Sequence, residues 1–143
     1  MTGQAEWIAY YELTQAKAAY CRILDTRDWN SLAALMTTDV EFGMSNGDAE
    51  PAMTVGRDET LALLQSLVAG AKTVHQVHTP EIDLDDNAAR VIWAVQDRAV
   101  FDSGISVTGY GHYTERWVRQ AEQWKLASSR LTHLITDIHQ VTA

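Results

Sequence analysis

The chain has 143 residues, of which 46% are hydrophobic and 21% are charged, as is usual for a globular domain with its own core. Its net charge of −8 argues against a nucleic-acid-binding surface, because phosphate binding needs clustered lysine and arginine. No apolar run reaches membrane-spanning length, and the first residues lack the features of a signal peptide. A lone Cys21 excludes an internal disulfide and a cysteine metal cluster. We therefore expect a single domain, residues 1–143, in the cytoplasm, with no nucleic-acid or membrane partner.

The first helix is predicted from about Glu6 to Leu24. Its apolar stripe recurs at the spacing of one helical face and comprises Trp7, Tyr11, Ala18 and Cys21. Asp25 continues this stripe, although burying a carboxylate costs free energy unless a partner hydrogen-bonds it. Asp25 is therefore either a functional carboxylate or a turn residue just past the helix end.

The remaining chain gives two further helices and then almost only strands. Helical spacing predicts helices at 29–36 and 57–69, and residues 45–53 have the composition of a loop. Alternation of apolar and polar residues predicts strands at 40–44, 82–84, 88–101, 107–118 and 124–135. Three helices followed by long consecutive strands indicate an α+β fold, with an antiparallel sheet covered by the helices on one face.

Two histidines, His75 and His78, lie three residues apart between the third helix and the strand at 82–84. Histidine can take and return a proton near neutral pH, so each is a candidate base, and each could equally be a satisfied strand residue. Strict alternation places His78 on the face of Ile82, and only a break at Thr79–Pro80 would turn His75 inward. No third ligand has a recognisable spacing, so we expect no metal site.

Further candidates lie on the predicted strands. Asp97 ends an apolar row on the strand at 88–101, where it is either a site residue or the partner of a nearby arginine. Tyr110 and His112 share one strand face, and glycines occupy the other. Glycine in a strand often marks a bend or a close approach. Tyr110 and His112 therefore either line a pocket inside a bent sheet or face solvent outside it.

A buried aspartate beside a histidine fixes the tautomer of the ring and stabilises its protonated form. Such a pair could remove a proton from the carbon next to a carbonyl group, and a tyrosine hydroxyl could hydrogen-bond the oxygen on which charge develops. The chain has no nucleophilic serine motif, phosphate loop or dinucleotide fingerprint. We therefore expect acid–base chemistry without a cofactor.

The order of these motifs resembles the SnoaL-like proteins of the nuclear transport factor 2 superfamily. The matching segments cover nearly the whole chain and are residues 20–29, 32–40, 56–59, His75, 109–113, 124–126 and 130–131. The resemblance implies a cone-shaped fold, in which a strongly curved antiparallel sheet and three helices in the N-terminal half enclose an apolar cavity. It also implies a homo-oligomer, either a dimer or a trimer.

The resemblance is to the dehydratase branch, which includes scytalone dehydratase, lindane dehydrochlorinase and bile-acid 7α-dehydratase. In that branch an aspartate of the first helix pairs with a histidine, and Asp25 and His75 occupy these positions. The bile-acid dehydratase pattern adds Tyr20 and Asp97 as catalytic residues. The candidate substrate-binding residues are His78, Tyr110, His112 and Arg130.

The expected function is that of a cofactor-independent lyase, which removes water from a small apolar cyclic or polycyclic hydroxy-carbonyl substrate. His75 would be the base, Asp25 would orient it, Tyr20 would polarise the substrate oxygen, and Asp97 would assist the leaving hydroxyl or bind substrate. An isomerase or cyclase could use the same pair. The third alternative is a small-molecule-binding protein without catalysis.

Overall fold

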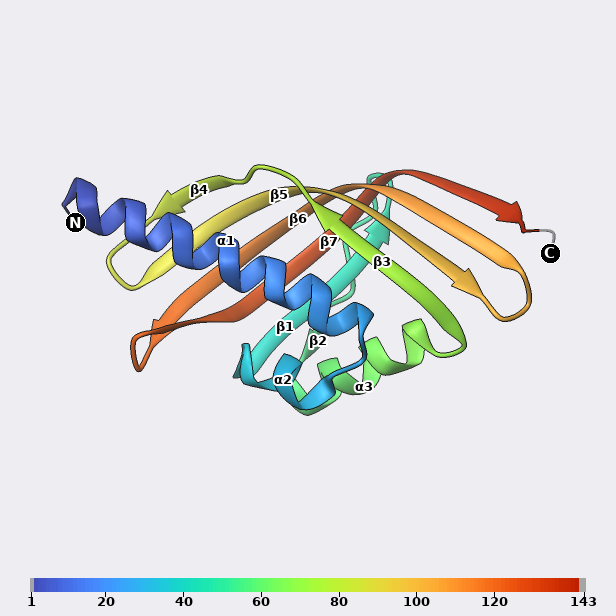
Figure 1. Ribbon diagram of the computed structural model, residues 1–143, viewed down its shortest axis with the longest axis horizontal. Coiled ribbons are helices and arrows are strands. Elements are labelled where there is room, and N and C mark those ends of the chain that lie inside the picture. Colours follow the sequence, from blue (N-terminus) through green and yellow to red (C-terminus); the bar gives the residue numbers. More distant parts are fainter. Residues whose placement is uncertain (1, 142–143) are drawn as a thin grey trace.

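The computed structural model describes residues 2–141, which form three helices and one curved, seven-stranded sheet (Figure 1). The helices are α1 (Gly3–Asp25), α2 (Trp29–Ala34) and α3 (Arg57–Val68). The strands are β1 (Met36–Asn46), β2 (Thr54–Val55), β3 (Ala71–Val77), β4 (Glu81–Leu84), β5 (Ala88–Phe101), β6 (Ile105–Gln120) and β7 (Gln123–Gln140). The predicted α+β class, with its helices in the N-terminal half, is confirmed.

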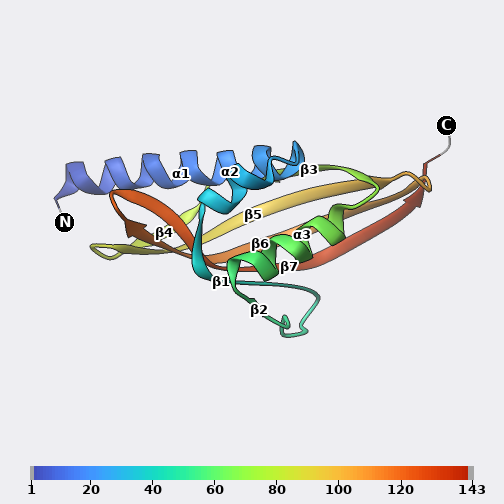
Figure 2. The ribbon, with the colours of Figure 1, turned by 90° about the horizontal axis from the view of Figure 1, so that it is seen from below.

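The strands follow the order β2-β1-β7-β6-β5-β3, and β4 pairs with β5 as a continuation of β3. Every pair is antiparallel except β1–β7, which is parallel, so the sheet is mixed where a purely antiparallel one was expected. Parallel neighbours need a long crossover connection, and the segment between β1 and β7 contains most of the other elements. Figure 2 shows α1 lying along one face of this sheet. Within residues 2–141, no helix has the length and apolar character needed to cross a membrane.

The buried face of α1 differs from the predicted stripe. Trp7 and Tyr11 are 74% and 66% exposed, and Ala18 is also exposed. The residues of α1 that are buried are Ala9, Leu13, Lys17, Tyr20, Cys21, Ile23 and Leu24. Periodicity missed this face because its central position is a lysine, which is almost never fully buried unless it is paired.

Lys17 is paired with Glu115 of β6, and both side chains are fully buried. Lys17 Nζ lies 2.7 Å from Glu115 Oε2, which also accepts a hydrogen bond from Ser129 Oγ of β7, and Trp117 Nε1 donates to Oε1. The ammonium group lies over the Tyr113 ring, 3.5 Å from its centroid, where a cation is attracted by the ring face. The pair therefore joins the middle of α1 to β6 and β7 inside the core.

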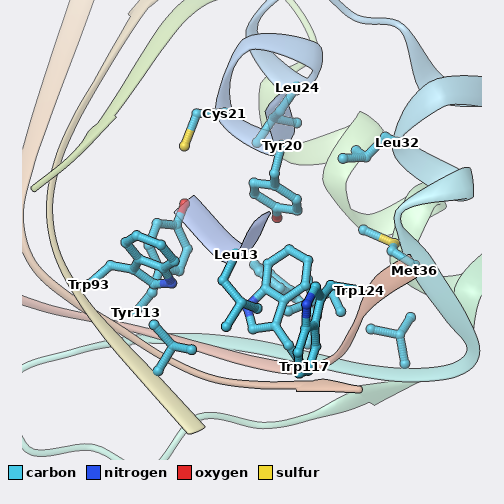
Figure 3. Close-up of a cluster of buried hydrophobic side chains, with 14 of the residues drawn as sticks. Leu13, Tyr20, Cys21, Leu24, Leu32, Met36, Trp93, Tyr113, Trp117 and Trp124 are labelled. Carbon is cyan, nitrogen blue, oxygen red and sulfur yellow. The ribbon is translucent and has the colours of Figure 1, made fainter. Parts of the chain in front are cut away.

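The hydrophobic core gathers aromatic side chains from α1, β1, β5, β6 and β7. Its aromatic members are Tyr20, Phe42, Trp93, Tyr113, Trp117 and Trp124, most of which are drawn in Figure 3. Trp93 and Trp117 are thus core residues. The partly buried Trp29 packs against the same cluster.

We predict that Lys17→Met lowers the free energy of unfolding by about 3–5 kcal/mol, because it leaves the Glu115 carboxylate buried without its counter-charge. Urea-induced unfolding measures this change. The double variant Lys17→Met, Glu115→Gln should be more stable than Lys17→Met alone, since a neutral amide needs no cation. Lys72→Met, at an exposed lysine, is the control. Equal stability of Lys17→Met and this control would contradict the prediction.

Candidate active site

Asp25, the last residue of α1, contacts His75 in β3 through both of its carboxylate oxygens. Oδ1 lies 2.6 Å from His75 Nδ1, and Oδ2 accepts the His75 backbone N–H at 2.8 Å. The side chains are 18% exposed for Asp25 and 12% for His75. The structure thus brings together the two residues that the sequence proposed as a pair. Because Nδ1 faces the carboxylate, Nε2 is the ring nitrogen left for a ligand.

A second layer of hydrogen bonds holds Asp25 in place. Thr73 Oγ1 donates to Asp25 Oδ1 at 2.9 Å and accepts from Arg27 Nη1 at 2.8 Å. Arg27 also donates to the backbone carbonyls of Leu24 and Ala71, which ties the end of α1 to the start of β3. Arg27 itself has a positive φ of 63°, which turns the chain out of α1. The carboxylate therefore has a fixed orientation before any ligand arrives.

The break between β3 and β4 turns His75 inward. From Val77 to Ile82 the chain takes five steps, whereas the facing segment of β5, from Val95 to Val91, takes four. The extra residue shifts the alternation, so His75 and Ile82 lie on the same inner face. His78 lies in the break itself and is exposed, so His75 is the histidine of this stretch that reaches the interior.

A second aspartate–histidine pair joins Asp97 of β5 to His133 of β7. His133 Nε2 lies 2.7 Å from Asp97 Oδ2, and the side chains are 8% exposed for His133 and 15% for Asp97. The alternative of an arginine partner for Asp97 does not hold, since Arg98 Nε donates to Ser106 instead.

Sequence reasoning missed His133 because β7 contains a bulge. Strict alternation from Leu126 predicts that His133 faces outward. In the structure, the pairing of β7 with β6 shifts at Ala127, which puts both Ser129 and His133 on the buried face. One feature of the sequence does indicate an inward His133: the apolar Leu131 lies two residues before it, and strand residues two apart share a face.

Strand β6 lies between Asp97 and His133, and Gly109 leaves room for them to meet across it. Gly109 pairs directly with Asp97 in the sheet register. A Cβ at this position would lie 2.5 Å from His133 Nε2 and 2.8 Å from Asp97 Oδ1. The expected close approach at this glycine is therefore the Asp97–His133 contact.

Both histidines line one predominantly apolar cavity of about 270 Å³. Its polar wall includes Tyr20, Thr73, His75, Asp97, Tyr113 and His133. Its apolar wall includes Leu24, Phe42, Leu64, Leu67, Phe101, Val107 and Leu131. Asp25 lies behind His75 and is not part of this lining. This arrangement is that of a small-molecule site, with few polar groups converging on an apolar pocket.

Tyr20 and Tyr113 contribute two hydroxyl-bearing rings, which meet edge to face with centroids 6.5 Å apart. Burial raises the pKa of Tyr20 well above its usual range, and the negative charge of Glu115 raises it further. Burial likewise raises the pKa of Tyr113, with Tyr20 as the next cause. Both phenols therefore stay protonated and can donate hydrogen bonds. Burial also raises the pKa of the nearby Cys21 thiol to about 11, so this cysteine is a poor nucleophile.

The four residues expected to bind substrate do not line this cavity. Tyr110 and His112 alternate with the buried Gly111 and Tyr113, so they lie on the outer face of the sheet. Arg130 is also on the outer face, where it pairs with Glu50, and His78 is exposed in the β3–β4 break. Across residues 2–141, no three His, Cys, Asp or Glu side chains group closely enough to hold a metal ion.

Solved structures of similar shape define the fold class. A Novosphingobium aromaticivorans DSM 12444 protein, provisionally named a scytalone dehydratase, aligns with a TM-score of 0.84 and 23% identity, over 99% of this chain and 95% of that chain. A hexachlorocyclohexane dehydrochlorinase, LinA type 2, aligns with a TM-score of 0.83 and 15% identity, over 96% and 93%. The chain therefore has the nuclear transport factor 2-like fold.

The family follows from the sequence comparison. The model of the SnoaL-like domain matches residues 5–130, and the chain belongs to this family. A Gibberella zeae protein named "Probable cyclase FGR4" is 26% identical over an alignment of 134 residues, which covers 85% of this chain and 89% of that protein. The family resemblance seen in the sequence is confirmed.

We predict that the two paired histidines have opposite tautomers when neutral. His75 should carry its proton on Nδ1 and His133 on Nε2, because each proton is held by the facing carboxylate. Proton–nitrogen correlation spectra of the histidine rings distinguish the two forms. Asp25→Ala should release the preference of His75 and leave that of His133 unchanged. The same tautomer at both histidines in the unmodified protein would contradict this geometry.

Proposed function

We propose that this protein is a cofactor-independent lyase that removes water from a cyclic hydroxy-carbonyl compound. The observation that carries the proposal is the 2.6 Å Asp25–His75 contact beside an apolar cavity. A carboxylate against one nitrogen of a buried imidazole is the arrangement that makes the other nitrogen an effective base.

In the proposed reaction, His75 Nε2 removes a proton from the carbon next to the carbonyl group. The imidazolium that forms is stabilised by the Asp25 carboxylate, which Thr73 already orients through a hydrogen bond. The apolar walls exclude water around this charge pair, which strengthens the attraction between the two groups.

Removing that proton places negative charge on the carbonyl oxygen. The Tyr20 hydroxyl is the proposed donor to this oxygen, and burial keeps the phenol protonated. The C–O bond on the neighbouring carbon then breaks as the double bond forms, and its oxygen takes a proton from a second, acidic side chain of the cavity and leaves as water. Every group required by this step is a side chain of the protein, which fits chemistry without a cofactor.

The size of the cavity favours a substrate of one or two rings. Its volume of about 270 Å³ lies just below the range of roughly 300–1,000 Å³ common for small-molecule sites. Within the expected class of cyclic or polycyclic compounds, the smaller molecules therefore match the cavity better.

The relatives support an elimination and also a second candidate. The names of the dehydratase and dehydrochlorinase neighbours both denote loss of a small molecule from a carbon skeleton. The cyclase name of the Gibberella zeae relative favours the alternative in which the same base drives ring closure. Both reactions begin with proton removal by His75.

We also propose the expected homo-oligomer, because exposed apolar side chains form one group on α1 and another on β7. On α1 these are Trp7, Ile8 and Tyr11. On β7 they are Leu134, Ile135 and Ile138. Groups of exposed apolar side chains often mark contact surfaces.

A panel of cyclic β-hydroxy ketones tests the reaction, with loss of water followed by ultraviolet absorbance. His75→Ala and Asp25→Asn should each lower turnover about 100- to 10,000-fold, the usual contribution of a general base. His139→Ala is the matched control, because His139 is an exposed histidine on β7. Full turnover by His75→Ala would refute the proposal. Thermal stabilisation by panel compounds without turnover would support a binding protein instead.

Tyr20→Phe should lower kcat about 100- to 1,000-fold, because it removes one donor to the developing oxyanion. The factor should be the same from neutral to mildly alkaline pH, since burial raises the pKa of Tyr20 and the phenol does not ionise there. Comparing kcat for both proteins across this pH range provides the measurement. A loss confined to alkaline solution would contradict the assigned role.

A further inference from the structure

The Asp97–His133 pair has no role in the proton removal just described, yet it faces the same cavity as His75. His75 and Asp97 are direct partners in the β3–β5 register. Direct partners on one sheet face have Cβ atoms about 4.5–5.5 Å apart. Four titratable groups therefore follow one another in the order Asp25, His75, Asp97, His133, with Asp25 behind His75 and the other three on the cavity wall.

The two histidines contact their aspartates through different ring nitrogens. Asp25 binds His75 through Nδ1, and Asp97 binds His133 through Nε2. The other ring nitrogen of His133, Nδ1, therefore has no hydrogen-bond partner among residues 2–141. A carboxylate at one nitrogen stabilises the imidazolium form, in which the other nitrogen carries a proton that it can donate.

We propose that His133 is a second catalytic residue, the acid that protonates the leaving hydroxyl group, with Asp97 as its positioning residue. This inference rests on the proposed lyase reaction and assigns the second half of it. It also narrows the substrate class to compounds whose leaving group must gain a proton, namely β-hydroxy ketones rather than halides or esters.

The proposed step conserves atoms and charge. The α C–H bond breaks and its proton goes to His75 Nε2, while the electron pair forms the new C=C bond. The C–O bond on the β carbon breaks, and its oxygen takes the proton of His133 Nδ1 and leaves as water. His75 ends protonated and His133 ends neutral, and exchange with solvent after product release restores both.

The placement of the pair favours this role over a purely structural one. Burying two titratable side chains costs free energy that an apolar pair would not. Their contact also requires Gly109, because any larger residue would intrude between the two side chains. A pair held this way against the cavity wall has its proton ready at a fixed position.

The test compares two derivatives of α-tetralone that yield the same naphthol. One carries a hydroxyl group on the β carbon, which needs a proton in order to leave, and the other carries an acetoxy group, which leaves as acetate without one. His133→Gln should lower turnover of the hydroxy compound about 100- to 10,000-fold and change turnover of the acetoxy compound less than about threefold. His75→Gln should lower both, because both reactions need the base.

Gly109→Ala provides a second variant that keeps both residues. The new methyl group should separate Asp97 from His133 and produce the same selective loss with the hydroxy compound. The control is His139→Gln, which changes an exposed histidine on β7, the strand that also carries His133. This variant should match the unmodified protein on both compounds. The shift of the His133 tautomer signal in Gly109→Ala reports separation of the pair independently of turnover.

The outcomes separate the two proposals. Selective loss of the hydroxy reaction in His133→Gln supports the acid role. Equal loss on both compounds, or no loss on either, overturns the acid role and leaves the His75 reaction standing. Full activity of His75→Gln, or no turnover of either compound by the unmodified protein, overturns the proposed function for this substrate class and the inference with it.

Discussion

The buried attraction between Lys17 and Glu115 fixes the position of α1 over the sheet, and the cavity depends on that position. Lys17 precedes Asp25 by eight residues, about 12 Å along a helix. Asp25 lies at the end of α1 and reaches β3 only if the whole helix keeps its place. Because an ion pair in the core needs both its partner and well-placed hydrogen bonds, it tolerates little sliding or rotation of the helix. The Lys17–Glu115 ion pair, which has a structural role, thereby fixes the position of Asp25 against His75.

The carboxylates of Glu115 and Asp25 follow a common plan, in which each is held by more than one hydrogen-bond partner. Glu115 contacts an ammonium group, a hydroxyl and an indole N–H. Asp25 contacts a ring nitrogen, a backbone amide and the Thr73 hydroxyl. Fixed polar groups in an apolar surrounding need little rearrangement when charge develops on a ligand, and this is the main way in which enzymes stabilise transition states.

The sequence predicted the fold class and the Asp25–His75 contact, because both depend on local periodicity and on a family pattern. It failed where a residue broke the local rule. The face of α1 was misassigned because Lys17 stands in its centre, and a buried cation can be recognised only through its partner on a distant strand. His133 was missed because a bulge reverses the alternation of β7, and sequence periodicity does not show a bulge. Alternation placed Tyr110 and His112 on the same strand face. The sequence does not show whether that face lies inside or outside the curved sheet.

Because of that bulge, the number of residues in β7 decides which of its side chains face the cavity. The extra residue, Ala127, sets the direction of every side chain that follows it on β7 until the pairing shifts again near Leu134. It brings Ser129 to Glu115 and His133 to Asp97 at the same time. A relative that lacks this one residue would present the opposite strand face to its cavity, even with an otherwise identical sequence. Within this family, a single insertion or deletion in the last strand could therefore exchange one set of cavity residues for another, without any substitution at the site.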